Sequence, residues 1–294
     1  MERLIIAKKG NGLKDLLDGL ALQPLEEQKI LSQASSLHAV LSLYREELRR
    51  PYTQSSKYVT PGETHEKEQR LAKRKGSSIL LSPAQIDAFL QSTIADEQEQ
   101  HYWRTAPFLE GLLQRSYQEG NNNFTLNMNV LTMRDFYGRS CRRFTEIRQL
   151  KGNPQHPLHV SIAGDMDLFG SHSEYLHCTI TGKVQFIIGF GQSVKHSSFI
   201  IHGDVKGNDF ANRAQNSDFY VDGEFDGEWI GGNCYVNGKL DGDLIGTVDH
   251  YASSCRFKTS NLRTLEKFVA SVPRGNQIIF VNSDGREEIV RDYG

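Results

Sequence analysis

Two neighbouring stretches of the sequence read almost as one phrase: FIIHGDVKG at residues 199–207 and FYVDGEFDG at residues 219–227. In both, apolar residues alternate with others, and a central glycine is followed by a charged residue. The phrase occurs five times between Val160 and Phe257, around Gly164, Gly182, Gly203, Gly223 and Gly238, whose successive differences are 18, 21, 20 and 15 residues. A repeat of this length is typical of a solenoid, in which a coil buries its apolar face only against neighbouring coils.

Apolar residues recur at three places around each glycine: four and two residues before it, and two residues after it. A step of two is the period of a β-strand with one buried face. If the coils stack, each place becomes a column of like residues about 4.8 Å apart along the core. The three columns are Val160, Cys178, Phe199, Phe219 and Cys234; Ile162, Ile180, Ile201, Val221 and Val236; and Met166, Val184, Val205, Phe225 and Leu240. The residue after each glycine is charged, as an outward position should be: Asp165, Lys183, Asp204, Glu224 and Lys239.

Two nine-residue phrases and one corner carry a family resemblance: FIIHGDVKG at 199–207, CYVNGKLDG at 234–242, and Ile230-Gly231-Gly232. They resemble the Gly-x-Gly-x-Gly type of β-helix repeat. This repeat forms the C-terminal domain of the large subunit of glutamate synthase and one of the subunits of formylmethanofuran dehydrogenase. The bactofilins, which stack comparable coils into filaments, are more weakly similar. The resemblance covers roughly residues 158–258. It implies an architecture that serves mainly as a spacer or scaffold, with no catalytic residue to carry over.

We therefore predict an α+β chain, with a helical N-terminal part followed by a single-stranded parallel β-helix, or β-solenoid. A right-handed coil is the default for parallel crossovers. The predicted segments are an N-terminal helical segment at 1–50, a flexible linker at 51–78, a helical region at 79–157, the β-solenoid at 158–258 and a C-terminal cap at 259–294.

The C-terminal cap should contain a helix from Leu262 to Val272 and a hairpin around Asn282–Gly285. Such a cap hides the open end of a solenoid and opposes filament growth. Just before it, Arg256-Phe257-Lys258 fits a degenerate sixth coil. At the other end, Phe124–Val130 alternates like a strand and is either the first coil or a cap.

A stripe of apolar residues at helical spacing predicts a helix from Pro24 to Arg49: Ile30, Ala34, Leu37, Leu41, Tyr44 and Leu48. This stripe either packs on the neighbouring helices or forms a short coiled-coil seam between two chains. Residues 51–78 follow it with prolines, glycines and serines and few apolar residues. That composition favours a linker.

Capping residues mark further helix boundaries. Ser82-Pro83-Ala84-Gln85 is a capping box, with a Ser at the N-cap and a Gln three residues later. Pro107 is expected to start another helix that ends at Gly120. Thr132 with Asp135 predicts one more helix start before the solenoid.

Composition limits the classes of function. The net charge is −2 over 294 residues, which argues against a dedicated nucleic-acid binder. Nowhere does the sequence reach the run of about 20 apolar residues that a membrane span requires. Lys8, Lys9 and Gly10 stand where a signal peptide would have its apolar stretch. We therefore expect a soluble, cytoplasmic protein, with export without a cleaved signal peptide left open.

The cysteines and the other motifs point to no bound group. Cys141, Cys178, Cys234 and Cys255 form no C-x-x-C pair, so a zinc ribbon is excluded. Cys178 and Cys234 fall in an inward column, where a thiol acts as a small hydrophobe. There is no Walker, G-x-S-x-G or H-x-x-x-H pattern either, and we expect no cofactor.

One pair of side chains is a candidate site. Stacking would place His202 beside Asp222 in the outward column before each glycine, and a His next to a carboxylate can begin an acid–base pair. His202 and Asp222 are therefore the catalytic candidates. Together with Glu224 they are also the candidates for a divalent metal. The alternative is an ordinary surface ladder of opposite charges, like the expected pairs Lys183–Asp204 and Glu224–Lys239.

Two functions remain open from the sequence. The first is a non-catalytic scaffold or interaction protein with a rigid solenoid, which binds a protein partner through its N-terminal helices and allows a homo-oligomer. The alternative is a β-helix enzyme, or enzyme subunit, that acts on a polymeric or carbohydrate substrate. An enzyme should have a groove along one solenoid face, crossed by perturbed titrating groups. A scaffold should have flat charged ladders, with apolar surface only on the helical part.

Overall fold

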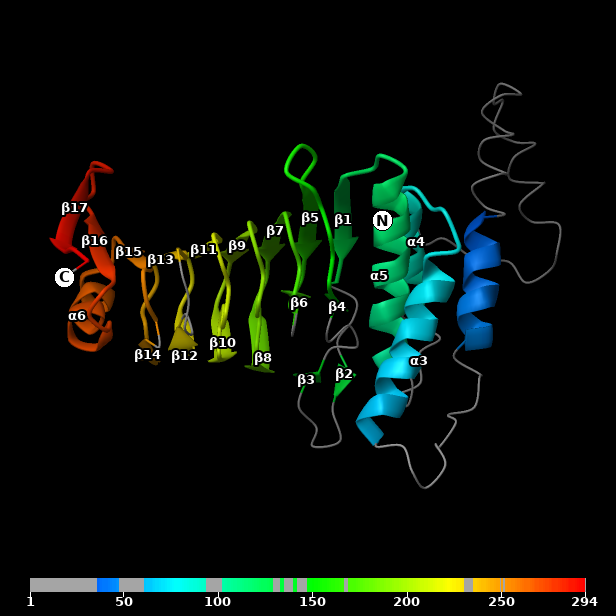
Figure 1. Cartoon of the computed structure of the whole chain (residues 1–294), viewed down its shortest axis with the longest axis horizontal. Coiled ribbons are helices and arrows are strands. Elements are labelled where there is room, and N and C mark those ends of the chain that lie inside the picture. Colours follow the sequence, from blue (N-terminus) through cyan, green and yellow to red (C-terminus); the bar gives the residue numbers. More distant parts are fainter. Residues whose placement is uncertain are drawn as a thin grey trace, which may run out of the picture.

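The molecule is elongated, with helices at one end and a stack of β-strands extending from them (Figure 1). A computed structural model describes residues 36–47, 61–93, 102–128, 133–134, 140–141, 147–166, 169–229, 235–248, 250 and 252–293. The strands form a row of rungs, and a helix and a hairpin close the far end (Figure 1). The α+β chain with a capped parallel β-solenoid is therefore confirmed.

Two sheets form the solenoid. In order across the long sheet, the strands are β1 (Asn123–Asn127), β5 (Leu158–Ala163), β7 (Leu176–Thr181), β9 (Ser198–His202), β11 (Asp218–Val221), β13 (Asn237–Leu240), β15 (Arg256–Thr259), β16 (Gln277–Val281) and β17 (Glu287–Arg291). The short sheet consists of β14 (Thr247–Val248), β12 (Phe225–Trp229), β10 (Val205–Asn208) and β8 (Val184–Ile188). Neighbouring strands in both sheets pair in parallel, except β16 and β17, which form the predicted hairpin. From β7 to β14 the chain alternates between the two sheets, so it winds once around the core in each repeat.

The stack of strands begins earlier than predicted. β1 pairs in parallel with β5, so the alternating stretch at Phe124 is the first strand of the long sheet. In the region predicted as helical, 79–157, the last described helix ends at Gln118, and the described residues beyond it form strands and loops. The helix start predicted at Thr132 is also wrong for the described residues beside it, because β2 (Met133–Arg134) and β3 (Ser140–Cys141) pair as antiparallel strands. Further along, β4 (Ile147–Arg148) pairs with β6 (Phe169–Ser171).

The predicted inward columns form the core through the first four coils. Ile162, Ile180, Ile201 and Val221 lie in register on neighbouring strands, and each is at most 2% exposed. Beside them, Phe199 and Phe219 stack with ring centroids 5.2 Å apart. A second aromatic column joins Phe190 to Phe210 at 5.5 Å and Phe210 to Trp229 at 5.1 Å. Such stacked rings bury large apolar areas and keep successive coils in register.

The fifth coil is shifted by four residues from its predicted register. Phe219 pairs with Gly238, and Val221 pairs with Leu240, so Leu240 continues the column of Val221. Leu244, rather than Leu240, continues the column of Phe225. The glycine beneath Gly223 is Gly242, where a Cβ would overlap the Gly223 carbonyl oxygen, so only glycine fits this close approach. Val236 is buried but in another column, and Cys234 lies outside the described residues.

Part of the predicted linker is a packed helix. Residues 61–76 form α3 (Pro61–Gly76), whereas residues 51–60 lie outside the described part of the chain. The helix buries Ala72 and packs closely on α5 (Tyr102–Gln118), because Gly76 and Gly111 let the two backbones approach. Lys73 also forms an ion pair with the buried Glu110 at 3.0 Å. The linker prediction was therefore wrong for residues 61–76, because the polar composition of this segment gives no sign of its contacts with α5.

The boundaries of the other N-terminal helices agree only partly with the sequence. α4 (Pro83–Thr93) begins at the predicted capping box, with the Ser82 N–H donating to Gln85 Oε1 at 2.9 Å. The Gln85 N–H donates back to Ser82 Oγ at 3.4 Å. Pro107, however, lies inside α5 and does not start it. The left-handed φ of Gly120, +96°, ends that helix region as predicted.

The apolar stripe of the first described helix, at residues 36–47, faces the core of its own chain. Tyr44 is 1% exposed and packs edge-on against Phe89 and Phe108, with ring centroids 5.2 and 5.3 Å away. Its hydroxyl hydrogen-bonds Thr105 Oγ1 at 2.6 Å. Leu37 and Leu41 pack partly buried on the same cluster, whereas Ile30, Ala34 and Leu48 lie outside the described residues. The described residues therefore show packing within the chain, and a seam between two chains stays a prediction.

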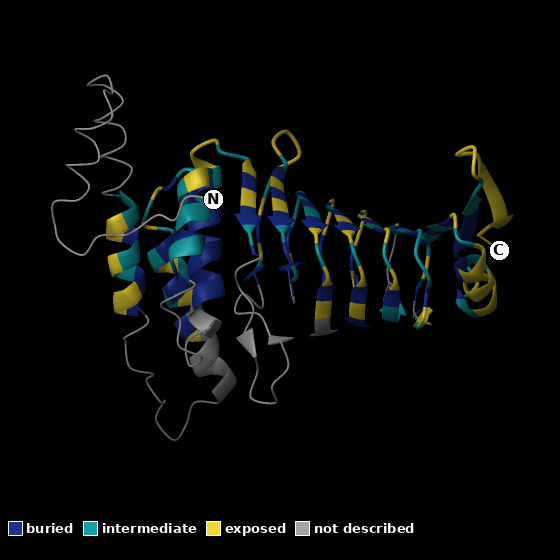
Figure 2. Ribbon diagram, turned by 180° about the vertical axis from the view of Figure 1, so that it is seen from behind, coloured by how far each residue is buried: buried dark blue, intermediate teal, exposed yellow. Residues whose placement is uncertain are grey.

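The C-terminal cap agrees with its prediction. β15 continues the long sheet as the degenerate sixth coil, and α6 (Leu262–Ser271) follows with Asn261 as its N-cap. The Asn261 side chain accepts hydrogen bonds from the N–H groups of Arg263 and Thr264. β16 then joins the sheet in parallel, and β17 folds back on it. Figure 2 shows α6 and β17 as the most exposed elements of this end.

Candidate functional site

The candidate pair lies on the outer face, which we define as the outward side of the long sheet. Because side chains alternate along each strand, the outer face carries rows of polar residues that cross the strands. One row contains Thr181, His202, Asp222, Asp241 and Ser260. The next row contains Ile200, Tyr220, Lys239 and Lys258. A third contains His159, His177, Ser198, Asp218 and Asn237.

His202 and Asp222 are in contact, as predicted. His202 Nδ1 lies 2.7 Å from Asp222 Oδ2. The other oxygen, Asp222 Oδ1, accepts the backbone N–H of Gly203 at 2.9 Å. The two side chains remain 46% and 38% exposed, so water competes for both of them. An exposed pair of this kind is worth at most about 1 kcal/mol.

The third metal candidate does not join the pair. Glu224 lies past the bend at Gly223, where its backbone N–H donates to Asp204 Oδ1 at 3.2 Å. Throughout the described residues, no group of three or more His, Cys, Asp and Glu side chains is arranged to hold a metal ion. His202, Asp222 and Glu224 therefore form no such group.

A second polar cluster lies one coil further along the outer face and was missed from the sequence. Asp241 Oδ2 accepts hydrogen bonds from Tyr220 Oη at 3.1 Å and pairs with Lys239 Nζ at 2.8 Å. Its other oxygen accepts from Ser260 Oγ at 2.8 Å. Lys239 also lies over the Tyr220 ring, with Nζ 4.8 Å from the centroid. The predicted register placed Asp241 three residues after the glycine of its coil, so it was not matched to His202 and Asp222, which stand just before theirs.

The contacts around Asp241 keep its carboxyl group ionised and the Tyr220 hydroxyl protonated at neutral pH. Burial alone would raise the pKa of Asp241, but hydrogen bonds from Lys239, Ser260 and Tyr220 and the Lys239 charge together lower that pKa. Burial, the hydrogen bond to Asp241 and the nearby carboxylates raise the pKa of Tyr220 to about 12. Asp241 therefore stays ionised and Tyr220 stays protonated. Neither is poised near pH 7, as a general acid or base would be.

Charge pairs continue this pattern along the solenoid. Lys183 Nζ lies 3.1 Å from Asp204 Oδ2, which confirms one of the expected ladder pairs. The other expected pair, Glu224–Lys239, is wrong, because the shifted register places Lys239 beside Tyr220 and Asp241. On the short sheet, Lys206 Nζ lies 2.6 Å from Asp226 Oδ2. These contacts form ladders of opposite charge between neighbouring coils.

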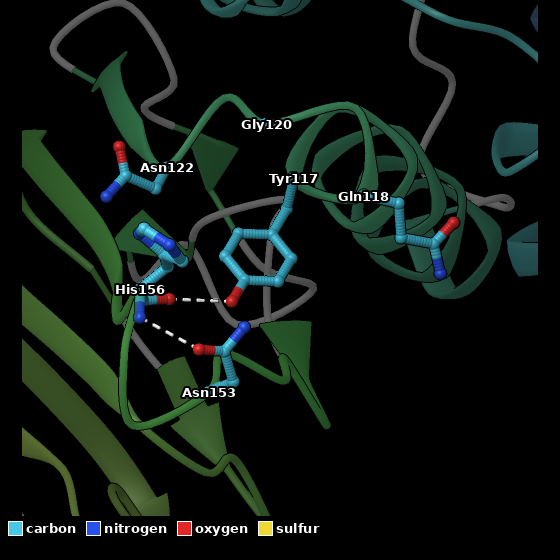
Figure 3. Close-up of a pocket in the computed structure, with 6 residues that line it drawn as sticks. All are labelled: Tyr117, Gln118, Gly120, Asn122, Asn153 and His156. Atoms are coloured by element: carbon cyan, nitrogen blue, oxygen red, sulfur yellow. Dashed lines mark hydrogen bonds between the residues drawn. The ribbon is translucent and has the colours of Figure 1, made fainter.

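A pocket of about 360 Å³ lies away from the candidate pair, where the end of α5 meets the loop before β5 (Figure 3). It is lined by Tyr117, Gln118, Gly120, Asn122, Asn153 and His156. Tyr117 Oη donates to the His156 carbonyl at 2.6 Å. Asn153 Oδ1 accepts the N–H groups of Gln155 and His156 at 3.0 and 2.8 Å. These bonds hold the loop in place, and β5 and β7 separate the pocket from His202 on β9.

A histidine pair on the outer face predicts a dependence on pH. The His159 and His177 rings stack with centroids 5.0 Å apart, and His177 Nδ1 hydrogen-bonds Ser198 Oγ. Burial and the neighbouring His159 lower the pKa of His177, against an opposing effect of Asp218. The unfolded chain then binds more protons near pH 6, so this contribution to stability is present above about pH 6.5 and is lost as the pH falls.

The expected loss is small, below about 1 kcal/mol, because the His177 side chain is only partly buried. Urea unfolding at pH 7.5 and 5.5 measures it. His177→Asn should lose less stability than wild type over this interval. Equal losses in the two proteins would show that His177 makes no contribution.

Comparisons of the chain with protein-family models, with curated proteins and with solved structures find no match. The resemblance to the Gly-x-Gly-x-Gly type of β-helix therefore stays a prediction, which rests on the phrases at 199–207 and 234–242. No described helix combines the length and the apolar character that a bilayer crossing needs.

Proposed function

We propose that this protein is a non-catalytic scaffold, in which a rigid β-solenoid holds two differently built ends at a fixed separation. The observation that carries the proposal is the bonding of the outer face. The carboxylates of Asp222 and Asp241 each use both oxygens in contacts with neighbouring coils. A face whose polar groups bond one another supports a structural role more than a role in catalysis.

The described helices give less support to partner binding than the sequence suggested. The helix at 36–47 turns Val40 and Tyr44 into the core, so binding through the N-terminal helices stays a prediction. In the described chain, apolar surface gathers instead at the C-terminal cap, where Leu262 and Ile289 are 64% and 57% exposed. The cytoplasmic location also stays a prediction.

An enzyme that acts on a polymeric or carbohydrate substrate is the second candidate. The 2.7 Å contact between His202 and Asp222 favours it, because a carboxylate can orient an imidazole for proton transfer. Against it, the pair is not among the residues that line the pocket at Tyr117 and His156. Substrate sites are usually concave, and they bury most of a bound ligand.

Asp222→Asn separates the two candidates. As a scaffold, the protein should lose at most about 1 kcal/mol of stability and keep its affinity for a captured partner within about twofold. Asp204→Asn is the matched control, because Asp204 is an exposed carboxylate of the same solenoid that pairs with Lys183. The measurements are urea unfolding, binding to partners identified from the source cells, and turnover of a panel of polysaccharides.

The scaffold proposal requires that both variants behave alike in all three measurements. A wild-type activity that disappears in Asp222→Asn and survives in Asp204→Asn would replace it with the enzyme.

A further inference from the structure

The pocket beside Tyr117 is held in shape by contacts between α5 and the loop at 151–157. Gln114 bonds both backbone groups of Lys151: its Nε2 donates to the carbonyl and its Oε1 accepts the N–H, each at 2.9 Å. One turn further along α5, Tyr117 Oη donates to the His156 carbonyl at 2.6 Å. The walls of the pocket are therefore in place before a ligand arrives, which reduces the ordering cost of binding.

Two of the lining residues keep hydrogen-bonding groups free. Asn153 uses its Oδ1 to accept the N–H groups of Gln155 and His156. No hydrogen bond within the described chain occupies the Asn153 Nδ2 or the His156 ring. Figure 3 shows both side chains beside the Tyr117 ring, whereas Gln118 extends away from them. The pocket thus places a free amide donor and a free imidazole next to a fixed aromatic ring.

The lining limits the class of ligand. No Asp, Glu, Lys or Arg lines the pocket. On α5 nearby, Arg115 and Glu119 pair with each other at 2.7 Å. A phosphate, carboxylate or ammonium group in the pocket would lose water and gain no opposite charge. No aliphatic side chain lines the pocket either, so an apolar ligand would contact only the Tyr117 ring.

A neutral saccharide satisfies these limits. Its hydroxyl groups both donate and accept hydrogen bonds, as the Asn153 amide and the His156 ring require. The C–H groups on the face of a sugar ring suit the negative face of an aromatic ring. The volume of about 360 Å³ falls within the range of about 300–1,000 Å³ that is usual for small-molecule sites. We propose that this pocket binds a neutral saccharide, with Tyr117 as the stacking surface and Asn153 and His156 as the hydrogen-bonding groups.

The pocket is a site of binding and not of cleavage. Glycoside hydrolysis ordinarily uses two carboxylates, and neither Asp nor Glu lines this pocket. The proposal goes beyond the scaffold function, because it attaches a glycan to the helical end of the molecule. It is also independent of that function, since the comparison of Asp222→Asn with Asp204→Asn alters no residue of the pocket.

The first test is the class of ligand. Saturation-transfer difference NMR of the full chain measures the binding of glucose, galactose, mannose and N-acetylglucosamine. At least one of these sugars should bind with a Kd of about 1 mM, the affinity expected for a ligand of this size. The matched controls are glucuronate, galacturonate and glucosamine, which carry a charge that glucose, galactose and N-acetylglucosamine lack. A charged counterpart should bind at least about fivefold more weakly than its neutral sugar.

The second test is the residues. Asn153→Asp keeps an acceptor for the N–H groups of Gln155 and His156 but loses the Nδ2 donor, so binding should weaken about fivefold. His156→Ala removes a ring that bonds nothing in the described chain and should weaken binding about threefold. Gln155→Ala is the matched control, because Gln155 lies in the same loop and does not line the pocket. It should change the Kd by less than about twofold.

Four results would overturn the proposal. One is a Kd above about 10 mM for all four neutral sugars. Another is a charged counterpart that binds more tightly than its neutral sugar. A third is tighter binding of the neutral peptide N-acetyl-trialanine amide than of any sugar, since the pocket would then select a peptide. The last is a Gln155→Ala variant that loses as much affinity as His156→Ala. Circular dichroism verifies the fold of each variant, and His156→Ala decides alone if Asn153→Asp alters the spectrum.

Discussion

Replacing Ile201 with aspartate is expected to unfold the solenoid. Ile201 is fully buried and lies in register between Ile180 and Val221, so a carboxylate there has apolar neighbours on both sides. Burial of an unpaired charge costs several kcal/mol, compared with a total stability of about 5–15 kcal/mol for a typical protein. Circular dichroism at 20 °C and thermal melting measure the effect. We expect no cooperative transition in this variant.

The adjacent residue supplies the control. Ile200 has the same side chain on the same strand but points to the outer face, where it is 37% exposed. Ile200→Asp should change the free energy of unfolding by less than about 1 kcal/mol. If Ile201→Asp melts at the wild-type temperature, the inward column is not where the register places it. If both variants unfold, the loss comes from aspartate in the strand and not from burial.

The second large effect is expected from Gly227→Ala. Gly227 has φ +147°, and a Cβ there would overlap the carbonyl oxygen of Gly207 on the neighbouring coil. The carbonyl belongs to the backbone of a packed strand, so it cannot move aside as a flexible side chain could. Backbone strain of about 1–2 kcal/mol and overpacking of about 1–3 kcal/mol together predict a loss of about 2–5 kcal/mol in urea unfolding.

Gly285→Ala separates the two contributions. Gly285 also has a positive φ, +81°, but nothing lies within 4 Å of an added Cβ in the hairpin turn. It should therefore show the backbone strain alone, about 1–2 kcal/mol. The close approach between coils predicts that Gly227→Ala loses clearly more stability than Gly285→Ala. Equal losses would mean that the coils can separate at Gly207 without cost.

The core could be predicted where one glycine marks each coil. The columns through Ile162, Ile180, Ile201 and Val221 followed from a strand period and a repeat, because burial of one face dictates both. The prediction failed at the fifth coil because Gly238 and Gly242 both have apolar residues two positions before and two positions after them, and only the position four before differs. The backbone approach of Gly242 to Gly223 decides between the two, and this contact is not visible in a sequence.

The other errors of prediction also come from contacts between residues that are distant in sequence. α3 has a polar composition, and it is held by contacts that are distant in sequence, such as Lys73 with Glu110 and Gly76 with Phe108. The pair His202–Asp222 was predictable because both residues stand just before the glycine of their coils. The cluster of Tyr220 and Asp241 was not, because it depends on the register of the fifth coil.

Because the coils stack one on the next, the number of coils sets the length of the solenoid. Each coil touches only the one before and the one after, and neighbouring rungs are separated by about 4.8 Å. The separation between α5 and α6 can therefore change only in whole steps, by gain or loss of one repeat such as residues 203–222. Point substitutions leave that separation unaltered. In this respect the solenoid acts as a molecular ruler, in which each repeat marked by a glycine adds one step of about 4.8 Å.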